Sequence, residues 1–174
     1  MTYARFQIQS RDNKRQSDIA LLQSQLERYY QKNNEYPGSC PSALPASCTS
    51  YSSGVQIQLN QSLANLDSIM PGLDVNFGDP LRLSSGSYFN DLSNPSYYYI
   101  GGLYSNVNSS VTFSWPGTSV TCNYSLTLAA GQQSSYIIAY YNELNKKPVF
   151  LKGQRGVQFT WPQNAVSQPS CVTS

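Results

Sequence analysis

Four cysteines, Cys40, Cys48, Cys122 and Cys171, bear most directly on the covalent chemistry of this 174-residue chain. No two of them form a CxxC pair, and without histidine the common zinc spacings cannot be assembled. An even number of scattered cysteines in a chain rich in Ser, Thr, Asn and Tyr favours disulfides in an oxidising compartment. Of the three pairings, we favour Cys40–Cys48, which closes a short Pro-containing loop, with Cys122–Cys171, which ties back the C-terminal tail.

Catalytic chemistry has few candidates in this composition. The chain contains no histidine, which excludes His-dependent hydrolase triads, His-ligated metals and imidazole proton shuttles. A Ser–Lys dyad or a carboxylate pair would be needed instead, and no Glu is placed beside an Asp. Neither a Gly-rich phosphate loop nor EF-hand spacing among the loop aspartates is present. We therefore expect no enzyme activity, no catalytic residue, no cofactor and no metal site.

The charges are few and unevenly distributed. Only 11% of residues are charged, the net charge is +2, and half of the charges lie within the first 35 residues. One basic cluster, which contains Lys146, Lys147, Lys152 and Arg155, surrounds an expected strand. Such lysines more often block edge-to-edge pairing than bind phosphate, so nucleic acid is a disfavoured partner. Aromatic residues of the later loops and strands make a cell-surface glycan a candidate partner.

A single long helix is predicted over about Tyr3–Asn33. Its apolar stripe begins at Ile19 and leaves Asp12 and Arg15 on other faces, whereas the preceding residues around Phe6 are expected to be solvated. Asn33-Asn34 and Pro37-Gly38 end the helix. Because one end is packed and the other protrudes, we expect the protruding end to continue into another segment.

The rest of the chain alternates loops and strands. Residues 37–54 read as a loop, and a short helical turn is expected around Leu63–Ile69. Alternating β-branched and aromatic residues predict four strands, with a hairpin turn at Gly131 between the second and third and a further edge strand at Val157–Trp161. The four are Tyr97–Tyr104, Val120–Leu128, Tyr136–Tyr141 and Val149–Leu151. The prediction is an α+β fold in which the helix packs on an antiparallel sheet of about four strands, with long irregular loops. All of it forms one domain, divided into residues 1–36, 37–96 and 97–174.

Two segments resemble the type IV pilins and type II secretion pseudopilins. The first is the helix with its exit, from Ser10 through Asp18-Ile19 and Leu26-Glu27-Arg28-Tyr29-Tyr30 to Tyr36-Pro37. The second is Met70-Pro71 and Gly78-Asp79-Pro80, followed by Tyr97-Tyr98-Tyr99. The resemblance covers about 28 residues closely and about 60 more loosely. The family's hydrophobic half-helix is not among these residues, and we interpret Met1 as the start of a soluble piece from which it was removed.

The resemblance implies a pilin-like fold and a subunit of an extracellular filament for attachment or twitching motility. Partners would be other pilin subunits and the pilus assembly machinery, with an inner-membrane anchor before assembly and membrane contact only through the absent segment. The residues that anchor the helix on the sheet would be Ile19, Leu22, Leu26, Tyr29 and Tyr30. Mixed charges near neighbouring subunits would be filament contacts: Arg5, Arg11, Asp12, Arg15 and Asp18. The alternatives are a type II secretion pseudopilin and a secreted adhesin or glycan-binding module.

Overall fold

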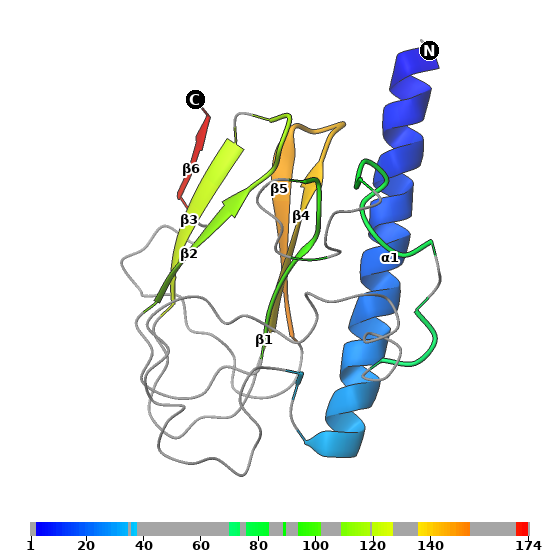
Figure 1. Ribbon diagram of the computed structural model, residues 1–174, viewed down its shortest axis with the longest axis vertical. Helices are drawn as coiled ribbons and strands as arrows, with labels where there is room; N and C mark the ends of the chain where they lie inside the picture. The colour runs from blue at the N-terminus through cyan, green and yellow to red at the C-terminus, as the bar shows by residue number, and fades with distance from the viewer. Residues whose placement is uncertain are drawn as a thin grey trace.

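A 31-residue helix, α1 (Tyr3–Asn33), opens the chain in the computed structural model (Figure 1). The structure describes residues 3–34, 36–37, 70–73, 76–83, 89, 94–101, 109–118, 120–126, 136–153 and 170–173. At 1.5 Å per residue the helix is about 46 Å long. It ends because Asn34 adopts a left-handed backbone (φ 55°), with its N–H donated to the carbonyl of Tyr30 at 2.7 Å. The predicted bounds and stop signal of the helix are confirmed.

The strands form two antiparallel sheets. In the first, β4 (Tyr136–Asn142) lies between β1 (Tyr98–Gly101) and β5 (Lys147–Lys152). In the second, β3 (Val120–Leu126) lies between β2 (Ser109–Ser114) and β6 (Ser170–Thr173). The β1–β4–β5 sheet stands between α1 and the second sheet (Figure 1). The fold is therefore α+β, with the helix on one face of the first sheet.

The expected single sheet of about four strands is wrong for the described part of the chain, which has six strands in two sheets. The predicted hairpin between the Val120 and Tyr136 strands is also wrong, because β3 and β4 belong to different sheets. Strands β2 and β6 were not predicted, because Ser and Thr occupy half or more of their positions. The turn at Gly131, the helical turn at Leu63–Ile69 and the edge strand at Val157–Trp161 lie outside the described residues.

The core follows the two-residue period of the strands. On the helix side, Tyr97 and Tyr99 share a buried cluster with Tyr136 and Ile138 of β4 and with the apolar stripe of α1. On the opposite face, Tyr98 packs edge-on against the buried ring of Trp115, with centroids 5.4 Å apart. The same Trp ring meets Tyr141 and Phe150 of the first sheet, at 6.0 and 6.4 Å. Both faces of the first sheet are therefore packed.

The chain folds back onto the core directly after α1. Tyr36 is almost fully buried, donates a hydrogen bond to Glu27 at 2.8 Å, and packs edge-on against Tyr136 at 4.7 Å. The carbonyl of Pro37 accepts a hydrogen bond from the Tyr99 hydroxyl at 2.9 Å. The Tyr-Pro pair thus fixes the C-terminal end of α1 against β1 and β4.

Candidate functional site: an ionic seam on the long helix

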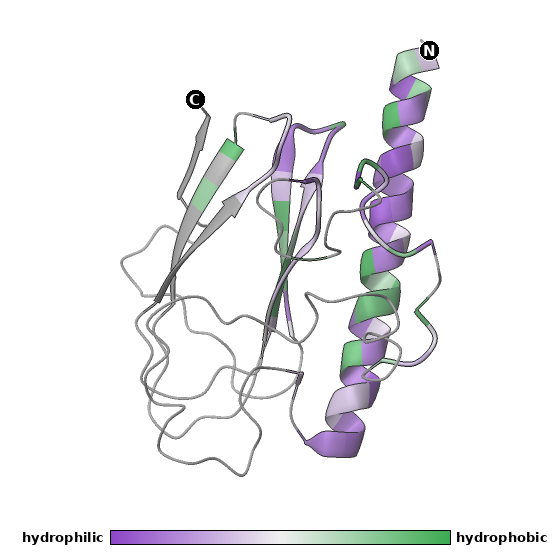
Figure 2. Ribbon diagram, in the orientation of Figure 1, coloured by the Kyte–Doolittle hydropathy of each residue, from purple (hydrophilic) through white to green (hydrophobic). Residues whose placement is uncertain are grey.

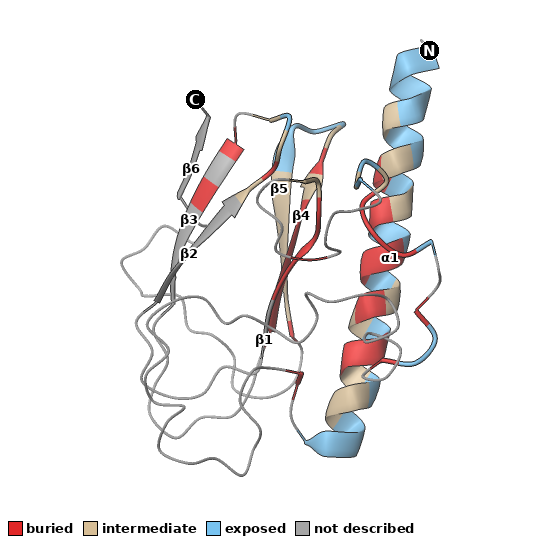
Figure 3. Cartoon of the chain, in the orientation of Figure 1, coloured by how far each residue is buried: buried red, intermediate tan, exposed pale blue. Residues whose placement is uncertain are grey.

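The buried stripe of α1 changes from apolar to charged partway along the helix. Leu26, Leu22 and Ile19 lie in the core, and the same three- and four-residue spacing continues to Arg15 and Asp12, which are 2% and 3% exposed. Figures 2 and 3 show this stretch of α1 as hydrophilic yet buried. The expectation that Asp12 and Arg15 lie on other faces of the helix is therefore wrong. Burial here requires partners for the charges.

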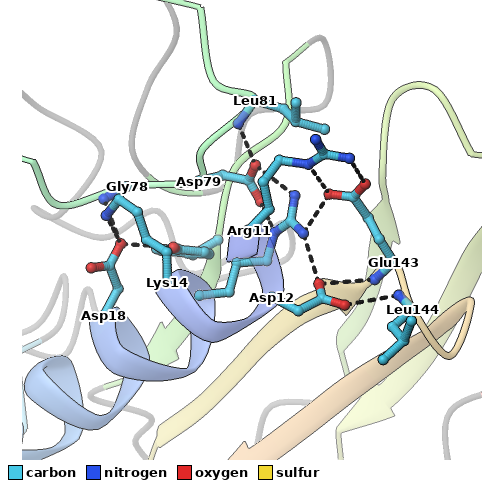
Figure 4. Close-up of polar contacts among 11 residues, drawn as sticks. Arg11, Asp12, Lys14, Asp18, Gly78, Asp79, Leu81, Glu143 and Leu144 are labelled. Atoms are coloured by element: carbon cyan, nitrogen blue, oxygen red, sulfur yellow. Dashed lines mark hydrogen bonds and ion pairs between the residues drawn. The ribbon is translucent and has the colours of Figure 1, made fainter. Parts of the chain in front are cut away.

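Arg15 is the centre of these contacts. Its guanidinium forms a two-bond pair with Asp79, from Nε at 2.8 Å and from Nη2 at 3.1 Å. Its Nη1 contacts the carboxylates of Asp12 at 2.8 Å and Glu143 at 2.5 Å. Figure 4 shows the carboxylates of Asp12, Asp79 and Glu143 gathered beside α1. All three guanidinium nitrogens are therefore bonded, as a buried arginine needs.

The turn between β4 and β5 is held to α1 by both charges and backbone. Glu143 accepts two hydrogen bonds from Arg11, at 2.9 and 2.6 Å. The carboxylate of Asp12 accepts the backbone N–H groups of Glu143 and Leu144, at 3.0 and 2.8 Å. Asp12 thus acts as a cap for the turn while it also faces Arg15.

The loop 76–83 is held on the other side of the helix. Asp79 pairs with Arg15 and also accepts the N–H of Leu81 at 2.9 Å. One oxygen of Asp18 accepts bonds from Lys14 at 2.7 Å, Gly78 N–H at 3.1 Å and the Tyr97 hydroxyl at 2.8 Å. We call these side chains and their contacts the ionic seam. Its charged members are Arg11, Asp12, Lys14, Arg15, Asp18, Asp79 and Glu143.

The ionic seam contains three cations and four carboxylates, and backbone N–H groups offset the excess negative charge. The hydrogen bond from Arg11 lowers the pKa of Glu143. Burial opposes ionisation of Arg15, but its bonds to Asp79 and Glu143 raise the pKa above the ordinary value. Burial, with the charge of Asp18 nearby, also raises the pKa of Tyr97. Glu143 and Arg15 are therefore charged at neutral pH, and the ionic seam joins α1 to two distant segments.

The five expected filament contacts have different positions. Arg5 is exposed near the free end of α1, and Arg11 is bonded to Glu143. Asp12, Arg15 and Asp18 are buried by the loops of their own chain. Their bonds explain why the helix buries charge, and they remove these three side chains from the surface of the isolated chain. A contact with another subunit stays a prediction for all five residues, and Arg5 and Arg11 are the ones that keep exposed surface in the isolated chain.

The residues expected to anchor the helix are mostly in the core. Ile19, Leu22 and Leu26 are almost fully buried, and Tyr30 packs partly buried against the same cluster. Tyr29 is half-buried, and its carbonyl accepts a hydrogen bond from the Asn33 side chain at 2.9 Å.

Two of the four cysteines are within the described residues. Cys122 is fully buried and disulfide-bonded, and its partner in the β3–β6 ladder is Cys171. Cys40 and Cys48 lie outside the described residues, so their pairing stays a prediction.

Sequence reasoning missed the partners that bury the charges. Asp79 and Glu143 lie 64 and 128 positions after Arg15, and no periodicity connects positions so far apart. One signal of such a partner was present in Gly78-Asp79-Pro80, because this turn carries an acidic residue that could pair with a cation of the helix. The second signal was the position of Arg15, which continues the spacing of the apolar stripe although it is charged.

Comparison with known proteins identifies no relative: no family model, curated protein or solved structure matches this chain. In the described part of the chain, no helix is both long enough and apolar enough to cross a membrane. The geometry of the ionic seam and of the exposed end of α1 therefore carries the functional argument.

Proposed function

We propose that this chain is the globular part of a structural subunit of an extracellular type IV pilus filament. The observation that carries the proposal is the unequal cover of α1. From Arg11 onward, its inner stripe is bonded or packed against its own domain, whereas residues 3–10 are exposed except for the half-buried Ile8 (Figure 3).

The exposed N-terminal end of α1 gains little stability from packing in an isolated chain. Short helical segments are marginal in water and gain most of their stability from packing of an apolar face. Tyr3 and Phe6 are 77% and 64% exposed, so their own domain supplies almost no cover. A bundle of the same helices from neighbouring subunits would supply it, which is the arrangement that the pilin resemblance implies.

The ionic seam suits such a subunit. A helix that transmits load between a filament core and an outer domain must be fixed to that domain along its length. Apolar packing does this around Leu22, and paired charges with backbone caps do it around Arg15. The seam therefore supports a structural role for the helix.

The disulfide supports an extracellular location. Cys122 is disulfide-bonded and lies directly opposite Cys171 in an antiparallel ladder. Directly opposite Cα atoms in such ladders are about 4.5–5.5 Å apart, within the range that a disulfide spans. We infer that Cys122 pairs with Cys171. The proposal includes an inner-membrane anchor before assembly, other pilin subunits and the assembly machinery as partners, and a cell-surface glycan as a candidate ligand.

The test is immunogold electron microscopy of source cells, with antibody against this domain, combined with a chromosomal Phe6→Asp substitution. We expect label along thin surface filaments, and loss of those filaments in Phe6→Asp while the purified variant domain keeps its circular dichroism. Arg28→Gln, which removes an exposed charge at the packed end of α1, is the matched control and should leave filaments intact. Label on the cell surface without filaments would favour the secreted adhesin instead, and label confined to the periplasm would favour the pseudopilin.

A further inference from the structure

The large exposed apolar side chains of the described residues belong to three segments that lie around the N-terminal half of α1 (Figure 1). Tyr3 and Phe6 belong to the free end of α1. Leu81 and Leu83 belong to the loop that Asp79 holds to the helix, and Leu144 belongs to the β4–β5 turn, held by Asp12. Figure 4 shows the backbone of Leu81 and of Leu144 bonded into the seam from its two sides. The ionic seam thus sets an apolar rim around the base of the free helix end.

Positive charge is exposed on or next to two of these segments. Arg5 lies on the free helix end, Lys146 lies in the β4–β5 turn, and Lys147 is the first residue of β5, all three exposed. In the described part of the chain, each acidic side chain is buried or half-buried, because the ionic seam and Tyr36 engage the carboxylates. We call Tyr3, Arg5, Phe6, Leu81, Leu83, Leu144, Lys146 and Lys147 the helix collar.

The positive charge of the helix collar favours an anionic lipid surface over a second copy of the chain as its partner. A symmetric contact between two collars would bring Arg5, Lys146 and Lys147 of one copy against the same cations of the other. An anionic lipid surface instead offers phosphates to the cations and an acyl boundary to the apolar side chains. We propose that the helix collar is a docking surface for the headgroups of an anionic membrane.

The dimensions agree with this partner. From Asp12 at the level of the collar to Tyr3 is nine residues, about 13 Å of helix. The headgroup layer on each side of a bilayer is about 5–7 Å thick. With α1 upright, the lysines of the collar would meet the headgroups while Tyr3 and Phe6 reach the acyl boundary. This inference goes beyond the filament proposal and differs from the expectation of membrane contact only through the absent segment.

The test is cosedimentation of the purified chain with vesicles of equimolar phosphatidylcholine and phosphatidylglycerol at low ionic strength. We expect binding that weakens with added salt and is absent on pure phosphatidylcholine vesicles. Each cation near an anionic surface contributes about fivefold in partitioning. The triple variant Arg5→Gln, Lys146→Asn, Lys147→Gln should thus lose on the order of a hundredfold. Asn is chosen for Lys146 because its backbone is left-handed (φ 52°).

A matched control separates location from net charge. Arg28→Gln with Lys32→Gln removes two exposed cations from the other end of α1. Arg28 lies about 24 Å along the helix from Asp12, more than two Debye lengths at 0.1 M salt, so binding measured at that salt concentration should be unchanged. Phe6→Ser should weaken binding without changing the salt dependence.

Three results would overturn the proposal: equal binding to neutral vesicles, equal losses in the triple and control variants, or no binding at low salt. Concentration-dependent self-association that Phe6→Ser abolishes, with no vesicle binding, would assign the collar to a second copy instead. Filament microscopy tests the proposed function separately, so the two failures are distinguishable.

Discussion

Replacing Arg15 by Met tests the energetic role of the ionic seam. Arg15 is 2% exposed, and its removal leaves Asp79, Asp12 and Glu143 facing one another without their shared cation. Breaking a buried ion pair from one side costs about 3–5 kcal/mol. Since a domain of this kind is stable by only about 5–15 kcal/mol, we expect a large fall in the free energy of unfolding. Urea unfolding followed by circular dichroism measures it.

A double-mutant cycle with Asp79→Asn separates the pair from its surroundings. The double variant Arg15→Met, Asp79→Asn removes both charges, and Asn keeps an oxygen for the N–H of Leu81. Neutralising both partners should therefore recover a large part of the stability lost in Arg15→Met, with a coupling free energy of about 1–3 kcal/mol. Arg28→Met, at an exposed position of the same helix, should stay within about 0.5 kcal/mol of the wild type.

The part of α1 that loses stability in Arg15→Met gives a second measurement. Amide hydrogen exchange should accelerate in residues 11–18 of Arg15→Met, whereas residues 19–26 keep their protection because their contacts are apolar. If Arg15→Met costs less than about 1 kcal/mol and exchange is unchanged, the charges are solvated and our reasoning about the seam is refuted.

Three further predictions concern pH and covalent chemistry. The hydrogen bond from Arg11 lowers the pKa of Glu143, so the stabilisation by the Glu143 carboxylate is complete above about pH 4.3 and is lost as the pH falls through the folded-state pKa. In Glu143→Gln, the free energy of unfolding should therefore change less with pH in the acid range than in the wild type. An unchanged pH dependence would contradict this. Burial raises the pKa of Tyr136 to about 12. The contribution of the neutral Tyr136 to the free energy of unfolding is therefore complete below about pH 10 and is lost as the pH rises through the folded-state pKa. Tyrosinate absorbance should report this, and Tyr136→Phe should resist alkali better than the wild type. Non-reducing peptide mapping should link Cys122 to Cys171, and Ser at both positions should cost about 4 kcal/mol in urea unfolding; a link from Cys122 to Cys40 would show the inferred pairing to be wrong.

The long helix and its stop could be predicted because their causes are local. The spacing of Ile19, Leu22 and Leu26 and the tolerance of Asn34 for a left-handed backbone depend only on neighbouring residues. The approximate positions of β1, β3, β4 and β5 follow from the same kind of signal, an alternation of β-branched and aromatic side chains.

Strand pairing could not be predicted in the same way. Loop proximity favoured a hairpin between β3 and β4, yet β4 pairs with β1 and β5, and β3 with β2 and β6. The aromatic contacts on both faces of the first sheet indicate what decides the arrangement. Tyr99 is buried by contacts on the helix side of the sheet, whereas Tyr98 is buried by packing with Trp115 on the other side, which needs a second layer there. These are tertiary requirements, and local alternation carries no information about them.

The buried charges were missed for a similar reason. Hydropathy places Asp12 and Arg15 on the solvent side of any helix, because a charged side chain in isolation loses hydration when it is buried. Their burial depends on Asp79 and on the turn at Glu143, which only the folded chain brings near.

The apolar and the ionic parts of the attachment of α1 to its domain respond to temperature in opposite ways. Around Leu22 and Leu26 the attachment is apolar, and apolar burial weakens on cooling. Around Arg15 it is ionic, and the cost of dehydrating paired charges falls on warming. Cooling therefore loosens the C-terminal part of the attachment relative to the N-terminal part, and heating does the reverse. Division of the attachment between two kinds of contact keeps α1 fixed to its domain over a wider temperature range than either kind alone would allow.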